Sequence, residues 1–119
     1  LEKRGILFGQ AISSPWLSGI MNTVRKGQNE QVIDHLLCAA MIEGRSCEKF
    51  QILSEALVPV DAPLARFYAS LVESEGNHYA SYLLMAKEVD ESETNRRLEF
   101  YLDLDAELVQ KPNDLHILH

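Results

Sequence analysis

Three side chains that suit a metal ion fall on two neighbouring stretches of this sequence. Glu75 and His78 stand three residues apart within "LVESEGNHYASYL", and Glu43 lies in the preceding apolar segment. In a helix, a spacing of three puts a carboxylate oxygen and an imidazole nitrogen on one face within a turn. Such donors suit iron or manganese, and no cysteine stands beside the histidine on that face to favour a zinc–thiolate site.

Helices joined by short turns must position these groups, because glycine and proline are few and no β-branched alternation occurs. The chain is therefore predicted to be all-α. The expected helices are one from the N-cap Ser14 to a stop at Gly27, one from the cap Asn29 to Leu57, one from the cap Asp61 to Val89, and one from Asp90 or Ser92 to Gln110, which is expected to be the most exposed.

Apolar seams on the second and third predicted helices contain the three candidate ligands. Steps of three and four give one seam of Ile33, Leu36, Ala40, Glu43, Cys47 and Phe50, and another of Leu64, Tyr68, Leu71, Glu75, His78, Tyr82, Met85 and Val89. Glu73 falls instead on the solvated face. A carboxylate in an apolar seam is costly unless a cation, a hydrogen bond or a metal compensates it.

The same three residues can also be interpreted as a hydrogen-bonded cluster without a metal ion. Glu-x-x-His occurs by chance in many helices, and Glu75 and His78 could form a buried hydrogen-bonded pair. Glu43 would then be satisfied by Arg45 or by a tyrosine such as Tyr68 or Tyr82. From the residues alone, both readings stay open.

Composition bounds the rest of the interpretation. With 119 residues, 46% of them apolar, the chain is expected to form a single domain over residues 1–119. No apolar run reaches the roughly 18–20 residues of a membrane span, and nothing at the N-terminus reads as a signal peptide, so we expect a soluble, cytoplasmic protein without a membrane partner. Cys38 and Cys47 fall on opposite sides of one helix and are expected to remain reduced thiols.

Charge is unevenly spread along the chain. The net charge is −7, yet residues 1–50 carry six Lys or Arg against five Asp or Glu, while residues 51–119 carry five against thirteen. The acidic total argues against indiscriminate nucleic-acid binding, but a local basic patch in the first half could contact phosphate. Roles without chemistry are expected for the remaining candidates. His35 is expected on a helix surface, His116 and His119 in a solvated tail, and Trp16 as a small hydrophobic anchor.

Two longer stretches resemble a known family. "VIDHLLCAAMIEGRSCEKF" followed by "LARFYASLVESEGNHYASYL" is similar to the paired signature of the tRNA-(2-methylthio-N6-isopentenyl adenosine) hydroxylases, the MiaE family, including its Ile-Glu-x-Arg-Ser-Cys-Glu-x-Phe core. The similarity extends upstream through "RGI" and "VRKG" and covers nearly the whole chain. It is far more specific than Glu-x-x-His alone.

The resemblance implies a ferritin-like four-helix bundle with a non-haem di-iron centre that uses O₂ and two electrons to hydroxylate the isopentenyl group of a modified adenosine in tRNA. Glu43 would match the lone glutamate of the second half-site, and Glu75 and His78 its Glu-x-x-His. An electron-donor protein would be a partner. Arg45 would lie behind the ligands or on the substrate side, and Arg25, Lys26, Arg45 and Lys49 become candidates for phosphate contacts, with solvated helix-end charges as the alternative.

The sequence departs from the family in one respect. A second lone glutamate and a second Glu-x-x-His are missing from the 119 residues. We therefore expect either a C-terminal fragment, whose missing helices precede Leu1, or two copies that meet to complete the site. The alternative functions are a ferritin-like iron-binding and iron-oxidising protein, or a metal-free helical interaction module.

Overall fold

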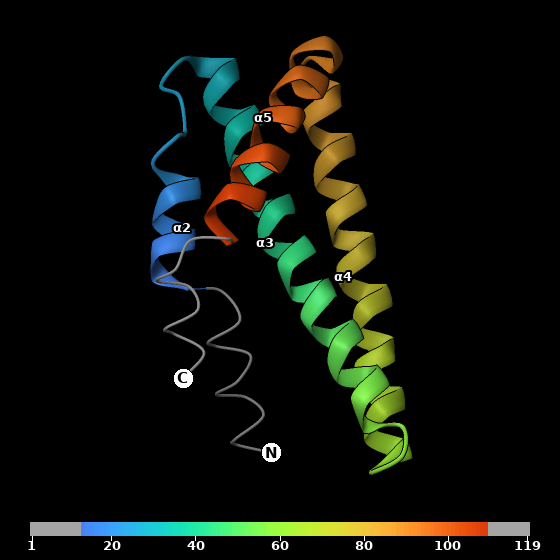
Figure 1. The fold of residues 1–119 in the computed structure, drawn as a ribbon. Helices are drawn as coiled ribbons and strands as arrows, with labels where there is room; N and C mark the ends of the chain where they lie inside the picture. Colours follow the sequence, from blue (N-terminus) through green and yellow to red (C-terminus); the bar gives the residue numbers. More distant parts are fainter. Residues whose placement is uncertain (1–12, 110–119) are drawn as a thin grey trace.

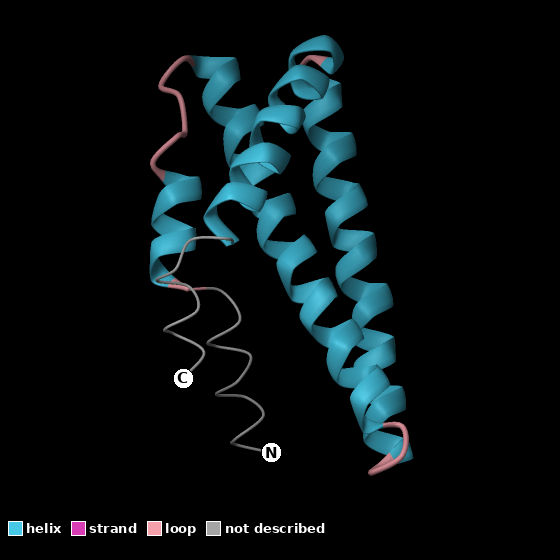
Figure 2. Cartoon of the chain, in the orientation of Figure 1, coloured by secondary structure: helices cyan, strands magenta, loops and turns pink. Residues whose placement is uncertain are grey.

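The computed structural model describes residues 13–109, which form an all-α helical bundle, as predicted. Two long helices, α3 and α4, run antiparallel as a hairpin, and the shorter α2 and α5 pack beside one end of it (Figure 1). Short loops make every connection (Figure 2). The helices are α2 (Ser14–Met21), α3 (Gln28–Leu57), α4 (Ala62–Val89) and α5 (Glu91–Val109).

Side-chain caps begin three of these helices. The Ser13 hydroxyl accepts a hydrogen bond from the Trp16 amide (3.1 Å), so the N-cap of α2 is one residue before the predicted Ser14. Asp61 caps α4 as predicted. Asp90 both ends α4, by donating its amide to Ala86, and caps α5, by accepting from the Glu93 amide (3.0 Å). One residue therefore joins α4 to α5.

The prediction that the first helix runs to Gly27 is wrong. Helix α2 ends at Met21, and the chain then leaves the helical path because its polar groups find other partners. The Thr23 hydroxyl donates to the Ile20 carbonyl (2.7 Å), and the Arg25 amide donates to a carboxylate oxygen of Asp34 (2.9 Å). These bonds fix the linker as an ordered connection.

The start of α3 also differs from the prediction. Gly27 rather than Asn29 is the N-cap, and its carbonyl accepts from the Gln31 amide at 2.7 Å. Gly27 provides no side-chain cap. The start of α3 therefore lacks the side-chain hydrogen bond that Asp61 provides to α4. The contacts of the linker with α3 stabilise the start of the helix instead.

The core lies where all four helices meet. Its buried members come from every helix, and they are Trp16, Ile20, Ile33, Leu37, Cys38, Ala40, Met41, Ala86, Tyr101 and Leu108. The expectation that the fourth helix would be the most exposed is wrong for its inner face, because Thr94, Tyr101 and Leu108 are buried. Most of its charges occupy the outer face, but Arg97, Glu93 and Asp105 are each only 17% exposed and bind partners on the neighbouring elements.

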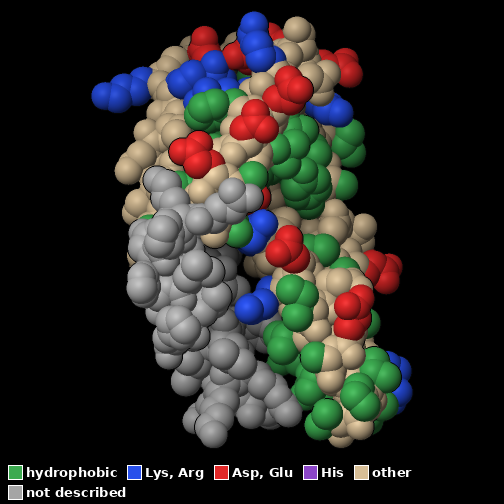
Figure 3. Space-filling view, viewed as in Figure 1, with side chains coloured by type: hydrophobic (Ala, Val, Ile, Leu, Met, Phe, Trp, Pro, Cys, Tyr) green, Lys and Arg blue, Asp and Glu red, His purple; other side chains and the backbone are tan. Residues whose placement is uncertain are grey.

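Farther from the core, α3 and α4 continue as a two-helix hairpin. Apolar side chains gather near the free end of that hairpin (Figure 3), where Val58 and Val60 are exposed. Both cysteines are free, as predicted. No helix within residues 13–109 is both long and apolar enough to cross a membrane.

Candidate metal centre

Helices α3 and α4 bring the three predicted ligands together. Glu43 extends from α3, and Glu75 and His78 extend from α4, so that one donor atom of each lies within 4.8 Å of the others. The Nδ1 atom of His78 is 3.7 Å from Oε2 of Glu43 and 3.8 Å from Oε1 of Glu75. One imidazole nitrogen therefore faces two carboxylates.

These distances distinguish between the two readings of the cluster. At 3.7 and 3.8 Å the imidazole is too far from either carboxylate for a direct hydrogen bond. Two ligands held about 2.1 Å from one octahedral ion lie about 3.0–4.2 Å apart. The two separations from His78 fall in this range, so they suit donors to one ion better than they suit direct hydrogen bonds.

Burial and charge support the same reading. The side chains of Glu43 and Glu75 are only 19% and 20% exposed, whereas that of His78 is 55% exposed. Within residues 13–109, His78 is the only ion-pair partner of either carboxylate. Arg45, a suggested partner for Glu43, contacts Asp105 instead. Two partly buried carboxylates thus lie side by side without a lysine or arginine, a costly arrangement that a cation would relieve.

The neighbours of the cluster offer no sulfur ligand. Cys47, one turn beyond Glu43, donates its thiol to the Val72 carbonyl at 3.5 Å and is absent from the converging set. Tyr79 follows His78, and burial, with a contribution from the Asp105 carboxylate, raises the pKa of its phenol. The donors are oxygen and imidazole nitrogen, which suit iron or manganese.

The four basic residues predicted to contact phosphate do not form one patch. Arg25 binds Asp34 and also Glu93, at 2.6 Å. Arg45 lies on the far side of α3 from Glu43, where its guanidinium contacts Asp105 at 3.1 Å. Lys26 is exposed and Lys49 is partly exposed. The role of all four in substrate binding stays a prediction, and two of them already neutralise carboxylates.

Sequence reasoning missed Asp34, the most heavily bonded side chain in the structure. Its fully buried carboxylate receives bidentate contacts from both Arg25 and Arg97, at 2.9–3.1 Å. Burial alone would raise the pKa of Asp34, but the hydrogen bonds from these two guanidiniums outweigh it and hold the pKa below its ordinary value. Arg97 also donates to the Thr23 carbonyl (2.8 Å), so the network fastens the α2–α3 linker to α5.

A second junction joins three helices behind Glu43. One carboxylate oxygen of Asp105 accepts from the indole nitrogen of Trp16 at 2.8 Å and lies 3.1 Å from Nε of Arg45. Trp16 is therefore a structural anchor, as predicted. His35 is exposed on α3, as also predicted, while His116 and His119 lie outside the described residues.

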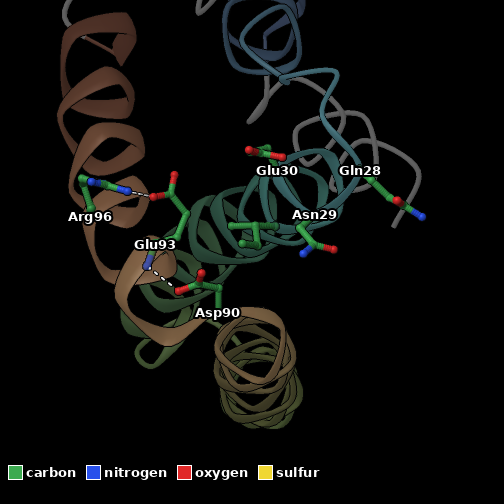
Figure 4. Close-up of a pocket in the computed structure, with 7 residues that line it drawn as sticks. Gln28, Asn29, Glu30, Asp90, Glu93 and Arg96 are labelled. Carbon is green, nitrogen blue, oxygen red and sulfur yellow. Dashed lines mark hydrogen bonds and ion pairs between the residues drawn. The ribbon is translucent and has the colours of Figure 1, made fainter.

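A separate pocket lies between the N-terminal ends of α3 and α5 (Figure 4). It is lined by Gln28, Asn29, Glu30, Ile33, Asp90, Glu93 and Arg96. Its charges are largely satisfied within the protein, because Arg96 pairs with Glu93 and the Glu93 amide donates to Asp90. The lining residues of α3 lie about 15 Å or more along the helix from Glu43, so this pocket is distinct from the metal cluster.

The family described as tRNA-(MS[2]IO[6]A)-hydroxylase (MiaE) matches this chain over residues 1–119. The chain belongs to this family. Two relatives bear the name tRNA 2-(methylsulfanyl)-N(6)-isopentenyladenosine(37) hydroxylase. The protein of Salmonella typhimurium is 33% identical over 113 residues, covering 95% of this chain and 41% of the relative. That of Pseudomonas putida is 36% identical over 115 residues, covering 95% of this chain and 54% of the relative.

Membership in the MiaE family confirms the resemblance seen in the sequence. The chain spans about half the length of the curated relatives it matches. No solved structure matches it significantly. The geometry of the cluster in this chain is therefore argued from its own residues.

Proposed function

We propose that this chain supplies one half of a carboxylate-bridged di-iron site in an O₂-dependent hydroxylase that acts on the isopentenyl group of a modified adenosine in tRNA. The observation that carries the proposal is the convergence of Glu43, Glu75 and His78 at distances suited to a shared ion. Membership in the MiaE family and the names of the two relatives support the reaction and the substrate.

Within this site the three residues would hold iron. Di-iron bundles use a glutamate from each of two helices and a Glu-x-x-His pair from each of the other two. Glu43 provides one lone glutamate and Glu75 with His78 one pair, which is half of that set. The remaining donors would come from further helices of the complete enzyme or from a second copy. Iron, when bound, would supply the activation of O₂.

The chain's own residues would shape the environment of that chemistry. Glu43 and Glu75 would bind as carboxylates, and their burial would limit access of water to the ions. The Nδ1 atom of His78 faces both carboxylates, so the imidazole would bind through that nitrogen and carry its remaining proton on Nε2. The Asp105 junction would hold α5 and α2 against the side of α3 that faces away from the ligands.

Substrate and electron partners follow from the proposed reaction. Lys26, which is exposed, and Lys49, which is partly exposed, would contact tRNA phosphates. Arg25 and Arg45 would contribute less, because each already contacts two carboxylates. Two electrons per turnover require a separate electron-donor protein. Action on tRNA would place the enzyme in the cytoplasm.

Iron binding tests the site directly. Chains carrying Glu75→Ala or His78→Ala should lose iron binding in an anaerobic ferrous titration, while the matched control Glu73→Ala, exposed on the same helix, should retain it. In the complete enzyme the first two changes should also abolish the hydroxylated nucleoside, as measured by mass spectrometry of digested tRNA. Full iron binding by either ligand variant would overturn the proposal.

Iron chemistry without tRNA chemistry would point to another function. Rapid iron oxidation by the complete protein with no hydroxylated nucleoside would favour a ferritin-like iron-binding role. A complete protein that binds no iron after reconstitution would instead be a metal-free helical module.

A further inference from the structure

We propose that Asp105 of α5 is a positioning residue for the metal cluster, because its carboxylate holds α3 and α4 in place at the level of Glu43 and His78. The proposal rests on the metal site proposed above. Asp105 is not among the converging donors. Its effect on a bound ion would therefore pass through the two helices that carry the ligands.

On α3, Asp105 binds the residue two positions after Glu43. Its Oδ1 atom lies 3.1 Å from Nε of Arg45, and Nη2 of Arg45 donates to its Oδ2 atom at 3.3 Å. The two side chains are only 17% and 22% exposed, whereas Glu48, the other carboxylate near Arg45, is 60% exposed. A two-point contact fixes both the position and the orientation of a guanidinium. Asp105 therefore restrains α3 close to Glu43.

On α4, the corresponding contact is made by Tyr79, which follows His78. A Cβ at Gly44, the residue after Glu43, would lie 3.6 Å from the Tyr79 ring, so the ring lies against α3. Burial raises the pKa of the Tyr79 phenol, and the charge of Asp105 adds to this effect. The Tyr79 side chain therefore lies near both α3 and Asp105.

Neighbours of the ligands, rather than the ligands themselves, carry these contacts. Consecutive residues of a helix point about 100° apart. His78 faces the cluster, while Tyr79 packs against the core that α3 and α4 share with α5 (Figure 1). Arg45 likewise points away from Glu43 and toward α5. A change at Asp105 would therefore alter the spacing of the two ligand helices without touching the donor atoms.

A third contact holds Asp105 itself in place. The indole nitrogen of Trp16 donates to its Oδ1 atom at 2.8 Å, and Trp16 is only 2% exposed. The carboxylate thus has fixed partners on α2 and on α3. Removal of a group that orients metal ligands typically weakens metal binding by about 10–100-fold. We expect the loss of the Asp105 charge to fall in this range.

The test uses cobalt(II) as the probe, because its visible absorption depends on the number and geometry of its ligands. Asp105→Asn keeps the size of the side chain but removes the charge that pairs with Arg45. The complete enzyme with this change should bind Co(II) about tenfold more weakly or worse, and with a shifted visible spectrum. Circular dichroism should show unchanged helical content. Unchanged affinity and spectrum in the folded variant would overturn the positioning role.

Two further variants separate positioning from a general loss of stability. Trp16→Phe removes the partner on α2 but leaves the contact with Arg45, so it should lower the urea midpoint and leave Co(II) binding and its spectrum unchanged. Arg45→Met should weaken Co(II) binding as Asp105→Asn does, and the two changes together should cost no more affinity than either alone. Equal losses of affinity in Trp16→Phe and Asp105→Asn would contradict the proposal.

His78→Ala tests the metal site independently of Asp105. If this change abolishes Co(II) binding while Asp105→Asn binds Co(II) as the wild type does, the metal site stands and the positioning role is wrong. Co(II) binding by the complete enzyme that does not require His78 would overturn both.

Discussion

His78 and Glu43 meet across two helices, with the imidazole Nδ1 of one 3.7 Å from the carboxylate Oε2 of the other. Thirty-five positions of chain separate them, so their approach depends on the register of α3 against α4 rather than on local sequence. The turn capped by Asp61 sets that register, and the ring stack of Phe50 on Tyr68 supports it, with centroids 6.0 Å apart. The cluster is thus a property of the hairpin.

Replacing one carboxylate of the cluster by an amide should abolish the stabilisation by metal without lowering the stability of the metal-free protein. Glu43→Gln keeps the shape of the side chain but removes a charge that lies beside Glu75 without a lysine or arginine partner. In metal-free buffer we expect the free energy of unfolding to stay equal or to rise by up to about 1 kcal/mol. With excess Mn(II), the wild-type urea midpoint should rise, because the ion binds the folded state, and the variant midpoint should not.

The matched control for that experiment is Glu73→Gln, an exposed glutamate on α4. It should retain the full metal-dependent shift of the midpoint. Equal shifts in the Glu43→Gln variant and in the control would show that Glu43 is not a ligand.

Asp34 should matter more for stability than any surface carboxylate. Asp34→Asn leaves the guanidiniums of Arg25 and Arg97 without their shared anion, and Arg97 is only 17% exposed. Breaking a buried ion pair from one side costs roughly 3–5 kcal/mol, and because Arg25 retains Glu93 we expect about 3 kcal/mol. Urea unfolding at pH 7 measures this cost. Asp103→Asn, exposed on α5, should change the free energy of unfolding by less than about 0.5 kcal/mol.

Acid should reproduce part of the Asp34→Asn effect. Because the folded pKa of Asp34 lies below its ordinary value, its contribution is present above the unfolded pKa of about 3.9 and is lost as the pH falls through the folded pKa. The free energy of unfolding should therefore fall more steeply below pH 4 in the wild type than in the variant. Parallel curves for the two proteins would rule out Asp34 as the group responsible.

Tyr101 should limit stability at high pH. Burial raises the pKa of its phenol to about 12, from an ordinary value of 10. The neutral ring stabilises the fold below pH 10, and this contribution, roughly 2–3 kcal/mol, is lost as the pH rises toward 12. Tyr101→Phe should cost about 1 kcal/mol at pH 7, because the hydrogen bond to Thr23 is lost, and should flatten the alkaline decline measured by urea unfolding.

Two of the helix boundaries and the pairing of Glu75 with His78 on one face of α4 could be predicted from the sequence because they depend on local signals. Asp61 and Asp90 are side-chain caps, and Glu75 and His78 share a face by spacing alone. Asp34 could not be found this way. It lies on the side of α3 away from the predicted seam, and periodicity does not reveal that α2 and α5 cover that second side.

The exposure of Met85 could not be predicted for a related reason. Steps of three and four placed Met85 in the seam that faces α3, but its side chain is 47% exposed. The buried positions of α4 are Ala65, Tyr68 and Ala86, and the last two lie about 100° around the helix from Met85. The contact with α3 covers only part of the apolar face of α4. The sequence alone does not show which part of that face α3 covers.

Two glycines should respond in opposite ways to the same substitution. A Cβ at Gly76, in the middle of α4, would meet no atom within 4 Å. Gly76→Ala should therefore stabilise the fold by about 0.5–1 kcal/mol through helix propensity. A Cβ at Gly19 of α2 would lie 2.7 Å from the buried side chain of Leu108, and such overpacking costs about 1–3 kcal/mol, so Gly19→Ala should destabilise the protein despite the same propensity gain.

A double variant tests that contact between α2 and α5. Adding Leu108→Ala opens space at Gly19, so Gly19→Ala should cost less in that background than in the wild type, which urea unfolding of the four proteins would measure as a coupling energy. Additive changes would mean that the close approach of Gly19 to Leu108 is not what makes alanine unfavourable. Leu108 belongs to α5, and Trp16 of α2 binds Asp105 one turn earlier on the same helix. An absence of coupling would therefore also argue against the close packing of α2 on α5 that this hydrogen bond requires.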